Sequence, residues 1–208
     1  MYKVANDRFA QIKQPNRDAG NNMQILLDAF LLTGQDKYLK LSEKIADAAS
    51  FDAVTKRTGR APGRGDGWQY GLFLKSLARL IEIKAERGVK DRKNTESYLK
   101  YARAILARSS SPRRGRRRRG FGGWSLLGSE VMMIAAELTG DRAERDKFRQ
   151  AAKDAFAGLD RLIGPDGQAG FGNSKSTTML LQGGGRYMRW ALTTQPATRP
   201  AATSQPAE

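Results

Sequence analysis

The sequence predicts an all-α domain built from stacked αα-hairpins, and three observations indicate this fold class. Apolar residues recur at helical spacing in successive segments, and short turns containing Gly separate many of these segments. Gly-Trp dipeptides at Gly67-Trp68 and Gly123-Trp124 precede two of the helical patterns, so the motif itself repeats. Alternating strand patterns are nearly absent. With 208 residues the chain is long enough for one domain with tails.

The first hairpin is predicted from two apolar stripes joined by a tight turn. The first stripe has the spacing i, i+3, i+4, i+7, i+8 and consists of Met23, Leu26, Leu27, Phe30 and Leu31. Gly34 follows, a residue that suits the left-handed conformation at a helix C-terminus. The second stripe consists of Tyr38, Leu41, Ile45 and Ala48. We expect Asp18, Ala19 and Gly20 to interrupt any helix before Met23.

Two further hairpins and a last helix follow in the same way. The third helix runs through Leu72, Leu74, Leu77, Leu80 and Ile81, and the fourth carries Tyr98, Tyr101, Ile105 and Leu106. The fifth contains Leu127, Val131, Ile134, Ala135 and Leu138, and the sixth contains Phe148, Ala152, Ala155, Phe156 and Leu159. A last helix is predicted from about residue 177 to residue 192.

The domain organisation follows from where these patterns begin and end. We expect a weakly structured leader over 1–19 and a helical-hairpin domain over 20–192, with an Arg-rich loop at 112–120. The Pro/Ala/Thr-rich segment 193–208 is predicted to be disordered. No stretch has the roughly 20 apolar residues of a membrane span, and no signal peptide is visible. Localisation stays open: cytoplasmic if the chain is complete, secreted or periplasmic if an N-terminal part is missing.

The amino-acid composition excludes several kinds of catalytic and metal site but does not identify an activity. The chain contains no Cys and no His, which excludes thiolate nucleophiles, imidazole bases and most zinc sites. We therefore expect no metal and no cofactor, and any catalysis would use Asp, Glu, Lys, Tyr or Arg. The formal net charge is +16, and it remains +10 without the six arginines between Arg113 and Arg119. This balance favours polyanionic partners, such as an acidic polysaccharide or nucleic acid.

One short segment of the sequence resembles a motif of a known enzyme family. The segment Gly63-Arg64-Gly65-Asp66-Gly67-Trp68, followed by Gly71-Leu72, resembles a Gly-Arg-Gly-Asn-Gly-Trp segment of the unsaturated glucuronyl and rhamnogalacturonyl hydrolases. These enzymes belong with the six-hairpin glycosidases and related polysaccharide lyases, whose (α/α) toroid the hairpin pattern also resembles. In that family the segment borders the substrate cavity. Because this chain has only about three and a half hairpins, the resemblance implies a partial toroid.

The loops that precede alternate helices form the predicted functional face. Helix N-termini there offer free N–H donors, and Trp offers a face on which a sugar can stack. Asp66 is the candidate catalytic carboxylate. The candidate substrate-binding residues are Arg64, Trp68, Gln69, Trp124, Lys175 and Arg186. Structural alternatives stand beside these roles: Trp68 and Trp124 as packed helix-start aromatics, which we favour, and Asp66 as a helix N-cap.

Two other features have competing interpretations. Glu130 lies on the apolar face of the fifth helix, where a buried carboxylate with a raised pKa would be a candidate general acid. We favour the simpler interpretation, a solvated glutamate at the edge of a stripe. The Arg113–Arg119 run would hold phosphates if it bound nucleic acid. We favour a solvated, self-repelling loop there.

The functional expectation is a carbohydrate-active or carbohydrate-binding toroid-like domain for acidic oligo- or polysaccharides. In that hypothesis Arg64 and Lys175 hold a uronate. If the domain is an enzyme, it is a glycoside hydrolase or a polysaccharide lyase. The alternative is a non-enzymatic helical-repeat module that binds a protein or a polyanion, including nucleic acid through the Arg-rich loop. The sequence indicates nothing about oligomeric state.

Overall fold

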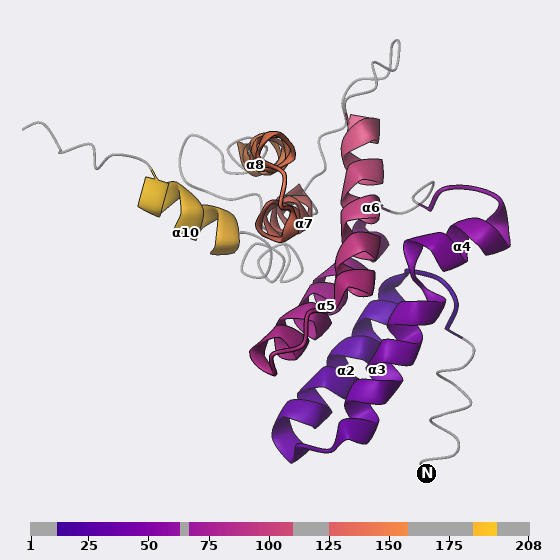
Figure 1. The fold of residues 1–208 in the computed structure, drawn as a ribbon. Coiled ribbons are helices and arrows are strands. Elements are labelled where there is room, and N and C mark those ends of the chain that lie inside the picture. Colours follow the sequence, from indigo (N-terminus) through magenta and orange to yellow (C-terminus); the bar gives the residue numbers. More distant parts are fainter. Residues whose placement is uncertain (1–11, 63–66, 110–124, 158–184, 195–208) are drawn as a thin grey trace, which may run out of the picture.

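The computed structural model confirms the all-α class. It describes residues 12–62, 67–109, 125–157 and 185–194, and within these ranges there are eight α-helices and no strand (Figure 1). The helices are α2 (Arg17–Thr33), α3 (Asp36–Ala48), α4 (Phe51–Thr58), α5 (Gly67–Glu86), α6 (Arg92–Ser109), α7 (Ser125–Leu138), α8 (Arg142–Ala157) and α10 (Gly185–Thr194). The expected Arg-rich loop at 112–120 and residues 195–208 of the expected tail lie outside the described residues. Thr193 and Thr194, which we had expected in that tail, are instead the last residues of α10.

The structure corrects the expected start of the first helix. Helix α2 begins at Arg17 and includes Asp18, Ala19 and Gly20, which we had expected to interrupt it. The reason is the cap: the Asn16 side chain accepts a hydrogen bond from the Ala19 backbone N–H at 3.0 Å. At the other end Gly34 is left-handed, with φ of 67°, and its N–H donates to the Phe30 carbonyl, as its position predicts.

Two smaller differences concern the same part of the chain. Helix α4 was not predicted, because its eight residues are too few to show a clear apolar period. Ser50 caps it by accepting a hydrogen bond from Ala53 N–H. Leu31 was placed in the apolar stripe of α2, but it is 47% exposed, and the buried stripe ends at Phe30.

The first helices of the three hairpins, together with α10, form one continuous row. Helix α2 packs on α5, α5 packs on α7, and α7 packs on α10. Helix α3 pairs with α2, α6 contacts α5 and α7, and α8 pairs with α7. Figure 1 shows α7 and α8 end-on where α2 and α3 are seen from the side, so these two hairpins cross rather than run parallel. The row brings α5, α7 and α10 together at the end farthest from α2.

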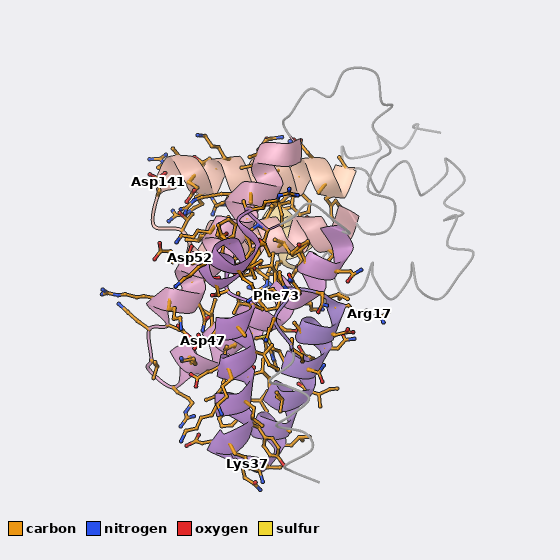
Figure 2. The ribbon with its side chains drawn as sticks, turned by 90° about the vertical axis from the view of Figure 1, so that its right-hand side faces the viewer. Arg17, Lys37, Asp47, Asp52, Phe73 and Asp141 are labelled. Atoms are coloured by element: carbon orange, nitrogen blue, oxygen red, sulfur yellow. The ribbon has the colours of Figure 1, made fainter. Side chains whose placement is uncertain are left out.

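One apolar core joins the helices of this row to their partners. Phe73 on α5 is fully buried and lies near the centre of the described helices (Figure 2). Two buried tyrosines of α6 combine ring packing with a satisfied hydroxyl. Tyr101 donates to the Ala49 carbonyl at 2.7 Å, and Tyr98 donates to the Val131 carbonyl at 3.1 Å. These two bonds tie α6 to the end of α3 and to α7.

Helices α2 and α5 approach so closely that only glycine fits between them. A Cβ built on Gly20 would lie 2.7 Å from the Leu72 carbonyl carbon and 2.8 Å from the Phe73 backbone nitrogen. The Gly20 carbonyl also accepts a buried hydrogen bond from the Ser76 hydroxyl at 2.8 Å. Because the atoms that a side chain at Gly20 would meet belong to the backbone of α5, they cannot move aside. The α2–α5 contact therefore depends on Gly20.

A bidentate ion pair connects α6 to α8. Arg103 donates to both carboxylate oxygens of Glu144, from Nε at 2.6 Å and from Nη2 at 2.9 Å. The Thr139 hydroxyl donates to the same carboxylate at 2.7 Å. Chiefly through the hydrogen bond from Arg103, these contacts lower the pKa of Glu144 to about 2.

We expect Glu144→Gln to lower the free energy of unfolding at pH 7, because the substitution removes the charge that pairs with Arg103. The loss should be only about 1–2 kcal/mol, since half of the Arg103 side chain is exposed and solvent screens the ion pair. A lowered folded pKa means that the stabilisation is complete above the ordinary Glu value and disappears as pH falls towards 2. Urea unfolding at pH 7 and pH 3 measures both effects, and the difference between the variant and the wild type should be clearly smaller at pH 3 than at pH 7. Asp146→Asn on the same helix, whose carboxylate is 62% exposed, is the control and should not shift the midpoint. Equal losses at both pH values would contradict the prediction.

Candidate functional site

A cavity of about 640 Å³ opens where α5, α7 and α10 meet. We call it the α7–α10 cavity. It is lined by Lys75, Glu130, Glu137, Gly185, Arg186, Arg189, Trp190 and Thr193. Its volume is within the usual range for small-molecule sites, about 300–1,000 Å³. The wall combines two carboxylates, three cations and one aromatic ring, and most of α7 beside it is apolar.

Glu130 is the most unusual group in this wall, and the structure corrects its expected exposure. It is 8% exposed rather than solvated. Its Oε1 accepts a hydrogen bond from Arg186 Nε at 3.0 Å, whereas its Oε2 is buried and has no hydrogen-bond partner among the described residues. Burial raises the pKa of Glu130, and the nearby Arg186 only partly opposes this. Glu130 was judged solvated because sequence alone does not show that α10 covers this part of α7.

Arg186 connects α10 to the two helices behind it. Besides Glu130, its guanidinium binds Glu82 on α5 and Glu137 on α7. One cation therefore faces three carboxylates from two helices. Aromatic contacts complete the attachment of α10: the Tyr187 ring lies 4.5 Å from that of Phe156, and Arg149 lies over the Trp190 ring at 5.6 Å. Arg186 thus has a clear structural role in addition to lining the cavity.

Lys75 and Tyr98 complete the ionisable groups around Glu130. Lys75 on α5 is half-buried, and burial lowers its pKa although the charge of Glu130 acts in the opposite direction. The fully buried Tyr98 has a pKa well above its ordinary value, mainly through desolvation and then through the charge of Glu130. Glu130 and Lys75 are therefore a carboxyl and an amine whose pKa values are both moved towards the neutral forms.

We expect Glu130→Gln to be at least as stable as the wild type at pH 7. A carboxyl whose pKa is raised by folding stabilises the protein fully below its unfolded value and loses that contribution as pH rises through the folded pKa. Glutamine resembles the protonated form and can still accept from Arg186. Thermal unfolding between pH 4 and pH 8 tests this: the wild type should lose stability relative to the variant as pH rises. A wild type that gains stability over this range would show that the ionised form is the favoured one.

Few of the residues predicted for the site can be placed. Arg64, Asp66, Trp124 and Lys175 lie outside the described residues, and Trp68 is at the start of α5 with its side chain also outside that description. Gln69 is half-buried in the first turn of α5. Arg186 is on the cavity wall. Of the predicted site residues, Arg186 is therefore the one that the structure places in the cavity, where it pairs with Glu130. Whether Arg64 and Asp66 share a site with Arg186 stays a prediction.

Six groups at or beside the cavity were missed: Lys75, Glu82, Glu137, Arg189, Trp190 and Thr193. A signal for them exists in the sequence. Lys75 and Glu82 are seven residues apart on α5, and Glu130 and Glu137 are seven apart on α7, where they are the only charged residues. Such a pair lies on one face of a helix two turns apart. Charges that recur on an otherwise apolar helix indicate a polar strip at an interface.

Within the described ranges, no three or more Asp, Glu, His or Cys side chains are grouped so that they could hold a metal ion. None of the described helices combines the length and hydrophobicity needed to cross a membrane. No protein-family model, no curated protein and no solved structure matches this chain. Its function must therefore be argued from the cavity itself.

Proposed function

We propose that this chain is a carbohydrate-active domain for acidic saccharides and that the α7–α10 cavity is its site. The observation that carries the proposal is Glu130. It is buried on the cavity wall, and one of its oxygens has no hydrogen-bond partner in the part of the chain that the structure describes. A carboxyl that stays protonated above its ordinary pKa is the group that glycoside cleavage uses to protonate the leaving oxygen.

The other groups of the wall suit a sugar acid. Trp190 offers an aromatic surface, and Thr193 and Glu137 offer hydrogen-bonding oxygens for hydroxyl groups. Arg189 lines the cavity and forms no ion pair with any described residue, so its charge is available for a uronate carboxylate.

Hydrolysis needs a second carboxylate, and Glu137 is the candidate. Glycosidases separate their two carboxyl groups by about 5–9.5 Å. Glu130 and Glu137 bind the same guanidinium group, so they lie no farther apart than its width and two hydrogen bonds allow. In this role Glu130 protonates the leaving group, and Glu137 acts as the nucleophile or activates a water molecule.

The test combines binding and turnover on a panel of acidic and neutral oligosaccharides. Calorimetry measures binding, and release of new chain ends measures cleavage. Glu130→Gln should keep binding and lose about 10²–10⁴-fold in turnover, while Glu96→Gln, an exposed glutamate of α6, should keep both. If no saccharide binds, the proposal is wrong. Binding without turnover in the wild type would instead favour the non-enzymatic binding module.

A further inference from the structure

The cavity holds a second reactive group that glycoside cleavage does not use. Lys75 comes from α5, on the side of the cavity formed by the central row of helices, and is half-buried. The charged groups of the same wall are Glu130 and Glu137 of α7 and Arg186 and Arg189 of α10. An amine and two carboxyl groups thus line one small cavity together with two guanidinium groups.

We propose that Lys75 forms a reversible imine with a small aldehyde or ketone that also carries a carboxylate, bound in the α7–α10 cavity. This activity goes beyond the saccharide proposal and does not depend on it. Three features support it: a lysine on the wall of a cavity large enough for a small molecule, a carboxyl oxygen without a partner beside it, and an arginine to select the anion.

The reaction balances without an oxidant or a reductant. The lone pair of Lys75 Nζ attacks the carbonyl carbon, and the carbonyl oxygen takes a proton from Glu130 to give a carbinolamine. The nitrogen then loses a proton to the Glu130 carboxylate. Glu130 returns this proton to the hydroxyl group, which leaves as water while the nitrogen lone pair forms the C=N bond of a protonated imine. The reverse sequence releases the ligand.

The ionisation of Lys75 and Glu130 suits imine formation. Nucleophilic attack needs a neutral amine, and loss of water needs an acid. Burial lowers the pKa of Lys75 and raises that of Glu130, so both required forms are more populated near neutral pH than in exposed side chains. Arg186 already faces three carboxylates, whereas Arg189 pairs with none of the described residues. Arg189 is therefore the group that holds the carboxylate of the ligand.

Reductive trapping tests the proposal on the full chain. Glyoxylate and sodium cyanoborohydride are added at pH 7, and peptide mass spectrometry follows the carboxymethyl adduct at each lysine. Lys75 should be modified at least tenfold faster than Lys44 and Lys153, which are exposed and outside the cavity. Ordinary surface reactivity predicts the opposite order. If Lys75 reacts no faster than these two lysines, the proposal is wrong.

Two variants separate the roles of the neighbours. Glu130→Gln removes a charge that raises the pKa of Lys75, so on charge alone it would speed the reaction. A slower reaction at Lys75 in this variant supports Glu130 as the proton donor, and a faster one overturns that role. Arg189→Met should remove the preference of Lys75 for glyoxylate over neutral propionaldehyde. An unchanged preference overturns the selection of an anionic ligand.

Discussion

Arg186→Met is expected to lower the free energy of unfolding by about 2–4 kcal/mol, the largest effect we predict. The side chain binds Glu82, Glu130 and Glu137, and its loss leaves the buried Glu130 without the guanidinium group that pairs with it. Removing one partner of a buried ion pair costs about 3–5 kcal/mol, and the exposure of Glu82 and Glu137 reduces this. Urea unfolding followed by circular dichroism measures the difference.

A matched control and a double variant make this prediction specific. Arg189→Met changes an arginine of the same helix that has no ion pair with the described residues, and it should leave the midpoint nearly unchanged. Adding Glu130→Gln to Arg186→Met should restore part of the lost stability, because the uncompensated buried charge is then absent. Equal midpoints for the two arginine variants would show that Arg186 does not hold α10 in place.

Gly20→Ala is expected to lower the free energy of unfolding by about 1–3 kcal/mol, the cost of forcing an extra group into a packed interface. The added Cβ would meet the backbone of α5 at 2.7–2.8 Å, where neither helix can yield without separating. The same substitution at Gly71 should cost less, because the atoms it meets belong to the Leu127 side chain, which can rotate. Chemical unfolding of the three proteins measures the order.

Gly128→Ala is the control for both glycines. Gly128 lies within α7. Apart from its chain neighbours and the backbone of its own helix, no atom of the described residues is within 4 Å of the added Cβ. Alanine has the better helix propensity, so this variant should gain about 0.5–1 kcal/mol. If Gly20→Ala and Gly128→Ala had equal stabilities, the close approach of α2 to α5 would be refuted.

The helices were predictable because their signals are local. The stripe from Met23 to Phe30 and the glycine at Gly34 define α2 without reference to any other segment. The N-terminus of α2 shows where local reasoning fails. Gly20 has a low helix propensity, yet the Asn16 cap and the contact with α5 outweigh it. Gly20, which its propensity marks as a helix breaker, is therefore the residue at which α2 contacts α5.

The candidate site was less predictable because its groups meet only through the fold. Glu82, Glu130 and Arg186 come from three helices and are as much as 104 residues apart along the chain. Their spacing within each helix indicates a polar face, but it does not say which faces meet. Glu130 illustrates the consequence: its charge and position were visible in the sequence, and its burial was not.

Periodicity and composition are properties of the chain alone, and they predict the helical class, the position of most helices and the absence of His and Cys chemistry. The contact of α10 with α7 and the three carboxylates around Arg186 arise from the packing of distant helices and cannot be read from the sequence. The same packing alters the pKa values of Glu130 and Lys75. Desolvation and ion pairing depend on which distant segments pack around a group and exclude water from it. The local sequence does not show which segments these are, so the pKa shifts could not be predicted from it.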